Sequence, residues 1–127
     1  MTENEIAKVV VNSSVSIHRS LGPGLFEIVY QRVLAYELRK AGLKVETETP
    51  VPLEWDGNIL DESFRADMII EGKLLLELKS LEKLSPVHKK QVLTYLRLLD
   101  LRLGLLLNFG AELMKEGIHR IANGIED

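Results

Sequence analysis

Three charged residues stand inside the two apolar runs of the segment 67–79, which reads DMIIEGKLLLELK. Each run is long enough for a β-strand, and the Glu-Gly pair between them is a turn signal. The segment therefore predicts a β-hairpin whose strands carry Asp67, Glu77 and Lys79. Acidic side chains in so apolar a run are costly to bury unless something neutralises them, and a divalent cation between Asp67 and Glu77 is one group that would do so.

The length of the turn decides whether the two carboxylates lie on the same face of the hairpin. Glu77 and Lys79 are two residues apart, so they share a face. A two-residue turn would put Asp67 opposite Leu76, on the other face. A three-residue turn pairs Asp67 with Leu75 or with Glu77, according to its position, and both registers return Asp67 to the right face. We therefore predict an odd-length turn or a bulge.

Helical and strand patterns alternate along the rest of the chain. Apolar residues at helical spacing, with a Ser-Pro start signal for the third segment, predict helices over about 3–20, 26–41 and 85–100. Apolar or alternating runs predict further strands over 44–53, 103–109 and 118–122. The two prolines of the first strand restrict it to a sheet edge or mark its end, and the continuous apolar run of the second predicts a central parallel strand.

The size and composition of the chain are those of one globular domain. It has 127 residues, of which 46% are hydrophobic and 28% charged, so we expect a single domain over 1–127. The absence of cysteine excludes a disulfide framework, a thiolate metal site and a cysteine nucleophile. No stretch has the apolar length of a membrane span and the amino end does not resemble a signal peptide, so we expect a cytoplasmic protein with no membrane partner.

The net charge of −3 argues mildly against a nucleic-acid binder, because affinity for phosphates comes from Lys and Arg. The distribution of charge is more favourable, because a metal would offset the site carboxylates and basic residues gather just after the hairpin. These residues are Lys79, Lys83, His88, Lys89, Lys90 and Arg97. Charge alone therefore does not decide the question.

Three motifs follow one another along the chain. Residues 24–30, GLFEIVY, fit G-x-x-E-x-x-Y; Asp67 followed by Glu77-x-Lys79 fits D…E-x-K; and residues 91–95, QVLTY, fit Q-x-x-x-Y. Together they resemble the PD-(D/E)xK nuclease superfamily. Within it the chain is similar to the GxxExxY family of small bacterial proteins, and the last motif is typical of RecB-like branches.

The resemblance covers roughly residues 5–122 and implies a fold. That fold is a restriction-endonuclease-like α/β core, in which helices flank a central mixed β-sheet of about four to five strands. The expected order is αβββαβ, with an extra helix at the amino end. The chain departs from the motif at 65–66, where Arg-Ala occupies the place of the Pro in the family name. That position supplies no ligand.

The same resemblance implies roles for the hairpin residues. Asp67 and Glu77, joined by the main-chain carbonyl of Leu78, would bind one or two Mg²⁺ or Mn²⁺ ions, since hard cations prefer oxygen ligands. The metal would activate a water and polarise the scissile phosphate. Lys79 would position that water or stabilise the developing negative charge.

Residues on two helices would complete the site. Glu27 shares a helix face with the apolar stripe that begins at Tyr30, so we place it on the buried side; it is either a helix-start charge favoured by the dipole or a site residue aimed at the sheet. The resemblance favours the second role, in which Glu27 holds the metal directly or through a water. Gln91 and Tyr95 share a helix side, where they either satisfy each other or contact the substrate.

Simpler interpretations suffice for other polar and aromatic residues. Trp55, beside a turn, is expected to pack at the rim rather than to stack bases, and His18 to pack at its helix end. His119 and Arg120 are expected to be solvated rather than to contact phosphates. The acidic residues between the second helix and the hairpin are expected to be solvated charges: Glu46, Glu48, Glu54, Asp61 and Glu62.

The function that the resemblance implies is metal-dependent hydrolysis of phosphodiester bonds, with DNA as the expected substrate. Little sequence preference is expected, because 127 residues leave no room for a separate reading domain. The alternative is a non-catalytic module that keeps the fold to bind nucleic acid or a protein partner. The intact Asp67, Glu77 and Lys79 favour the enzyme. The weak basic character favours the module, or an enzyme that relies on a homodimer or a partner protein to hold DNA.

Overall fold

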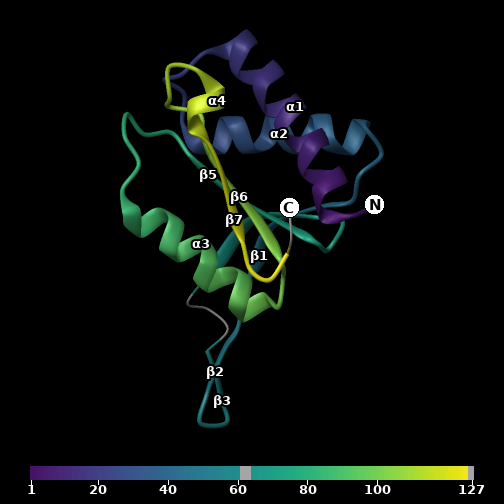
Figure 1. The fold of residues 1–127 in the computed structure, drawn as a ribbon, viewed down its shortest axis with the longest axis vertical. Coiled ribbons are helices and arrows are strands. Elements are labelled where there is room, and N and C mark those ends of the chain that lie inside the picture. Colours follow the sequence, from purple (N-terminus) through teal and green to yellow (C-terminus); the bar gives the residue numbers. More distant parts are fainter. Residues whose placement is uncertain (61–63, 126–127) are drawn as a thin grey trace.

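A five-stranded mixed sheet forms the centre of the structure, in the strand order β1-β4-β5-β6-β7 (Figure 1). The strands are β1 Val45–Pro50, β4 Arg65–Ile70, β5 Leu74–Lys79, β6 Leu103–Asn108 and β7 Ile118–Ala122. All neighbours are antiparallel except β5 and β6, which are parallel. This computed structural model describes residues 1–60 and 64–125, so the predictions made for Asp61 and Glu62 lie outside the described residues.

Helices cover both faces of the sheet. Helices α1 (Glu3–Leu21) and α2 (Glu27–Lys40) pack on one face, and α3 (Pro86–Leu99) packs on the other (Figure 1). Alternate strand residues point to opposite layers, so each strand contributes to both cores. From β4 and β5, the first core receives Met68, Ile70, Leu74, Leu76 and Leu78, and the second core receives Ala66, Ile69 and Leu75.

The observed order confirms the predicted restriction-endonuclease-like architecture. After the extra helix α1, the helices and central-sheet strands follow in the order α2, β1, β4, β5, α3 and β6, which is the expected αβββαβ order, and β7 then adds an edge strand; β2 and β3 lie between β1 and β4 outside this sheet. The Ser-Pro signal marks the start of α3, where Ser85 Oγ accepts a hydrogen bond from the Val87 N–H. None of the helices in the described part of the chain is long and apolar enough to cross a membrane.

Three short elements were not predicted: two strands that form a small hairpin, and one helix. Strands β2 (Leu53–Trp55) and β3 (Asn58–Leu60) form a separate hairpin that projects from the body at the bottom of Figure 1. The expectation that Trp55 packs at the rim is wrong: its side chain is 73% exposed, because the two-stranded hairpin extends beyond both helix layers.

The third unpredicted element, helix α4 (Met114–Gly117), follows β6. His18 is buried near the loop that precedes α4, with its Nε2 2.8 Å from the Ala111 carbonyl, as expected of a packing histidine.

The β4–β5 turn has the predicted odd length. Ile70 pairs with Leu74, which leaves three residues in the connection, and the Lys73 N–H donates to the Ile70 carbonyl at 3.0 Å. Glu71 and Gly72 both have left-handed backbone conformations, with φ of 54° and 63°. Continuing the observed register along both strands places Asp67 opposite Glu77.

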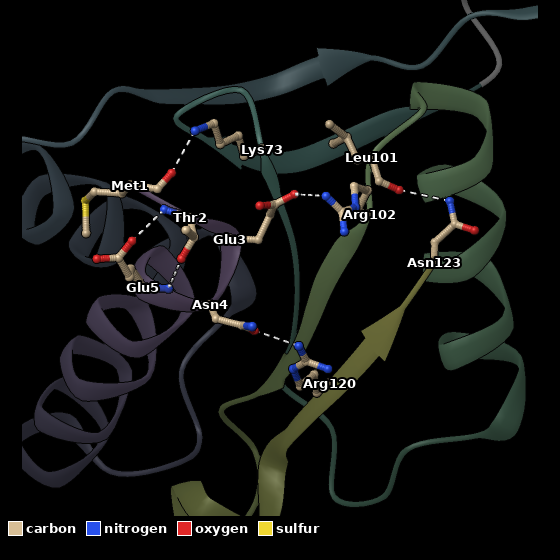
Figure 2. Close-up of polar contacts among 10 residues, drawn as sticks. All are labelled: Met1, Thr2, Glu3, Asn4, Glu5, Lys73, Leu101, Arg102, Arg120 and Asn123. Carbon is tan, nitrogen blue, oxygen red and sulfur yellow. Dashed lines mark hydrogen bonds and ion pairs between the residues drawn. The ribbon is translucent and has the colours of Figure 1, made fainter. Parts of the chain in front are cut away.

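Polar contacts fix the start of α1 at the end of the sheet where β5 and β6 begin (Figure 2). Lys73 Nζ donates to the Met1 carbonyl at 2.7 Å, Arg102 lies 3.9 Å from a carboxylate oxygen of Glu3, and Arg120 Nη2 donates to Asn4 Oδ1 at 2.6 Å. Arg120 is thus bound to α1 rather than only solvated. The opposite end of the sheet, where β5 ends with Glu77 and Lys79, is left for the candidate site.

Candidate functional site

Asp67 and Glu77 meet where the paired part of the β4–β5 ladder ends. The ladder runs from the pair Ile70–Leu74 to the pair Met68–Leu76. Beyond it, carboxylates take over as hydrogen-bond acceptors for the main chain: the Asp67 N–H donates to Glu77 Oε1 at 3.1 Å, and the Leu78 N–H donates to Asp67 Oδ2 at 2.8 Å. The two acids are therefore held in place by the strand end itself.

The environment of the pair opposes two negative charges. Glu77 is only 5% exposed. Burial, and after it the charge of Asp67, raises the pKa of Glu77 to about 8, while burial is also the main cause that raises the pKa of Asp67. Without a cation, the pair therefore retains a proton near neutral pH. A divalent cation would remove the repulsion that keeps it there.

Lys79 and Tyr95 lie close enough to the pair to interact with it electrostatically. The half-buried Lys79 follows Glu77 on the same face of β5, and its positive charge lowers the pKa of both carboxyls against the effect of burial. Tyr95 is buried under α3, and the charges of Glu77 and Asp67 add to burial in raising the pKa of its phenol. Its ring packs against Phe64, with centroids 5.7 Å apart.

Gln91 lies one turn before Tyr95 on α3 and is exposed. In the part of the chain that the structure describes, Gln91 and Tyr95 make no hydrogen bond to each other. One of the two interpretations of the motif was that Gln91 and Tyr95 form a hydrogen bond with each other at the edge of the core, and this bond is not observed. Gln91 is free to contact a ligand.

The prediction that Glu27 lies on the buried side of its helix is wrong, because its side chain is exposed. Glu27 is the first residue of α2, whereas Tyr30, Leu34 and Leu38, further along the same face, are fully buried. The helix enters the core only after its first turn. The carboxylate accordingly lies at the helix start, where the dipole favours it, and is accessible from solvent.

Three side chains fix the approach to Glu27. The Tyr30 hydroxyl donates to the Gly22 carbonyl at 2.6 Å and accepts from the Leu25 N–H at 3.2 Å, and its ring stacks on Phe109 with centroids 4.5 Å apart. Ser80 Oγ donates to the Leu25 carbonyl at 2.6 Å. The loop before Glu27 is thereby joined to the residue that follows Lys79.

Ser80 and Glu48 are residues at this site that the sequence analysis did not identify. Ser80 lines a shallow hollow with Phe26 and Glu27. Glu48, predicted to be a solvated charge, is indeed exposed, yet it stands opposite Asp67 in the β1–β4 register and its charge raises the pKa of Asp67. Its Oε1 accepts a hydrogen bond of 3.1 Å from the buried Gln31. Only the register between β1 and β4 reveals this proximity, and the sequence does not specify it.

Comparison with known protein families gives a match over nearly the whole chain. The family model of the PD-(D/E)XK nuclease superfamily matches residues 4–121. The chain belongs to this superfamily. No curated protein and no solved structure gives a significant match. Asp67, Glu77 and Lys79 are the residues that fit the D…E-x-K pattern of the superfamily, and the fold brings all three to one end of one sheet face.

Members of the PD-(D/E)XK nuclease superfamily are generally metal-dependent nucleases. Among residues 1–60 and 64–125, no three His, Asp or Glu side chains lie close enough together to enclose an ion. Mg²⁺ does not need such an enclosure, because it commonly binds one or two carboxylates and takes the rest of its ligands from water and substrate phosphates. The Asp67–Glu77 pair, in which Glu77 is buried and Asp67 half-buried and both pKa values are raised, fits that kind of site.

Proposed function

We infer that this protein is a Mg²⁺- or Mn²⁺-dependent nuclease that hydrolyses phosphodiester bonds, with DNA as the principal substrate and little sequence preference. The observation that carries the inference is the Asp67–Glu77 carboxylate pair beside Lys79, in a chain matched by the family model of a nuclease superfamily. Its motifs support assignment to the GxxExxY family and to a RecB-like branch. A single domain over 1–127, a bacterial source and a cytoplasmic location complete the proposal.

The carboxylates of Asp67 and Glu77 would hold the ion together with the main-chain carbonyl of Leu78. In a β-strand, the carbonyl of a residue lies on the same side as its N–H. Since the Leu78 N–H points to the Asp67 carboxylate, the Leu78 carbonyl faces the same gap between β4 and β5. When bound, the metal supplies charge neutralisation at the phosphate and a lowered pKa for a bound water.

The remaining side chains act on the substrate and the water. Lys79 carries a positive charge next to the carboxylate pair, which suits it to stabilise negative charge that develops on the phosphate. Glu27, accessible at the start of α2 and fixed through Ser80, would orient the attacking water. Tyr95 braces the pair from α3, and Gln91, exposed one turn earlier, contacts the strand being cut.

A non-catalytic binding module is the second candidate function. It is favoured by the net charge of −3, which is unusual for a protein that must hold nucleic acid without help, and by the exposed Trp55 on a projecting hairpin. Such a module would bind nucleic acid or a protein through the same fold. A homodimer or a partner protein would equally relieve the enzyme of holding DNA alone.

Cleavage assays separate the two functions. Linear, circular and branched DNA, and RNA, are incubated with Mg²⁺ or Mn²⁺ and with the wild type, Glu77→Gln, Lys79→Ala or Glu54→Gln. Glu54 is an exposed acid on β2 and serves as the matched control for Glu77. The nuclease is supported if the wild type and the control cleave while Glu77→Gln and Lys79→Ala, with their folds intact, do not. If the wild type cleaves none of the substrates and metal does not raise its melting temperature, the nuclease function is contradicted and the binding module is supported.

A further inference from the structure

A hollow of about 870 Å³ opens beside the candidate site. It lies between the connection 80–86, the first turn of α3 and the segment 110–116 that follows β6. In Figure 1 this connection and α4 are at the same end of the sheet, the end at which the parallel strands β5 and β6 terminate. The hollow is thus separate from the Asp67–Glu77 pair but borders the same edge of the sheet.

Three lysines line the side of the hollow that is formed by the connection and α3: Lys83, Lys89 and Lys90, which we call the basic wall. In the described structure none of the three side chains takes part in an ion pair or a hydrogen bond. The charge of Lys89, after burial, lowers the pKa of His119 across the hollow. The first turn of α3 adds the positive end of a 14-residue helix.

Acidic residues also line the hollow, and their position matters. Glu112 and Glu116 belong to the opposite side, after β6, and Glu82 precedes the basic wall. The formal charges of the three lysines and the three glutamates cancel in sum. Glu82 lies beside Lys83 on the connection, but Lys89 and Lys90 are on α3 and Glu112 and Glu116 are on the α4 side, so an anion would be attracted to the α3 side and repelled from the α4 side.

Asn108 holds the start of the connection that leads from the candidate site to the basic wall. Asn108, which is buried at the end of β6 beside Lys79, accepts from the Leu81 N–H and donates to the Leu81 carbonyl, both at 2.9 Å. Lys83 is four positions after Lys79 in the chain, a span of at most about 14 Å. A duplex advances about 3.4 Å for each nucleotide of a strand, so Lys83, the first residue of the basic wall, lies within a few nucleotides of Lys79.

We propose that the basic wall binds the phosphate backbone of the nucleic-acid strand on one side of the cut. This rests on the proposed function, and it explains how a chain with net charge −3 holds a polyanion: a local cluster of unpaired lysines supplies the contacts that the whole molecule does not. The contacts are to phosphates, so they contribute affinity without sequence preference.

The test is the salt dependence of nucleic-acid binding. Labelled single-stranded DNA, duplex DNA and RNA are titrated by fluorescence anisotropy at several salt concentrations, with all proteins in a non-cleaving Glu77→Gln background. We expect Lys89→Gln/Lys90→Gln to weaken binding and to reduce the slope of log K against log salt by about 0.7 to 0.9 for each phosphate that is no longer neutralised. The control, Lys8→Gln/Lys40→Gln, makes the same charge change at exposed positions on α1 and α2 and should leave the slope unchanged.

The outcomes separate this inference from the nuclease itself. Three results would overturn the proposal that the basic wall binds nucleic acid. They are an equal loss of affinity in both double variants, no loss in either, and no binding by the background protein. If the wild type cleaves DNA while Lys89→Gln/Lys90→Gln binds like the control, the nuclease stands and the basic wall is wrong. If the lysine variant loses binding as expected but the wild type cleaves nothing, the basic wall stands and the nuclease is wrong.

Discussion

Ser80 Oγ donates a hydrogen bond of 2.6 Å to the main-chain carbonyl of Leu25, and so joins the segment before α2 to the residue after Lys79. The bond crosses between two parts of the chain that are 55 residues apart. Glu27 lies two residues beyond Leu25 and Lys79 one residue before Ser80. Of the contacts that hold the segment before Glu27, this hydroxyl is the one that joins it to the strand carrying Lys79.

Replacing Ser80 by Ala should lower activity much more than stability. Removing a hydrogen bond of this kind costs about 1 kcal/mol of the free energy of unfolding, whereas a displacement of about 1 Å at a reacting group can cost about 10²-fold in rate. We expect kcat to fall by at least about tenfold. Single-turnover cleavage and urea unfolding measure the two effects, with Ser16→Ala on the exposed side of α1 as the control. Unchanged kcat would show that the bond does not position Glu27.

Metal binding should stabilise the folded protein through the Asp67–Glu77 pair. An ion that binds only the folded state at 100 times its dissociation constant adds about 2.7 kcal/mol to the free energy of unfolding. We expect Mg²⁺ and Mn²⁺ to raise the melting temperature of the wild type and of Glu54→Gln, but not of Glu77→Gln or Asp67→Asn. A rise that persists in both site variants would place the metal elsewhere on the protein.

Without metal, the stability of the protein should fall as the pH rises. Because the pKa of Glu77 is about 8 in the folded protein, against 4.5 for an ordinary glutamate side chain in an unfolded chain, the folded state binds the extra proton between these pH values. Its stabilising contribution is complete below pH 4.5 and is lost as the pH passes through about 8. Each unit of pKa difference corresponds to about 1.4 kcal/mol.

Urea unfolding in EDTA from pH 5 to pH 9 tests this dependence. Glu77→Gln removes the titrating group and should flatten the decline, while Glu54→Gln, which changes an exposed acid, should keep it. The same linkage makes metal compete with the proton, so the metal-induced rise in melting temperature should be larger at pH 8 than at pH 6. If stability declines as steeply with pH in Glu77→Gln as in the wild type, the decline is caused by other groups.

The sequence predicted most of the core because its patterns depend on local geometry. The parity of residues 67–79 was enough to require an odd turn, and the observed three-residue connection confirms it. The Ser85-Pro86 start of α3 and the edge strand with its prolines also follow from local rules. The superfamily match agrees with these elements over residues 4–121.

What the sequence could not predict depends on where elements end in three dimensions. Glu27 keeps the spacing of a buried stripe, but it is exposed because α2 enters the core only one turn later. Glu48 comes close to Asp67 through a strand register that no local pattern specifies. Trp55 is exposed because its hairpin projects beyond the helix layers. In each case the residue type could be read from the sequence, but the residues that surround it in the fold could not.

Two glycines near the candidate site should respond differently to an added methyl group. A Cβ at Gly110 would overlap the main-chain atoms of Leu81, in the connection that separates the carboxylate pair from the basic wall. A Cβ at Gly104 would lie 2.9 Å from Val92 Cγ1 and 3.3 Å from a methyl of Leu96, which are the ends of side chains. Side-chain ends can move at lower cost than a backbone that Asn108 holds by two hydrogen bonds.

Gly110→Ala should therefore lower the free energy of unfolding by more than Gly104→Ala, for which overpacking predicts a loss of about 1–3 kcal/mol. Gly110→Ala should also reduce cleavage and nucleic-acid binding per folded molecule, because Leu81 connects Lys79 to the basic wall. Gly104→Ala, under α3 and away from that connection, should change stability alone. Urea unfolding and cleavage rates corrected for the folded fraction measure both effects. The reverse order of stabilities would show that the connection is free to move.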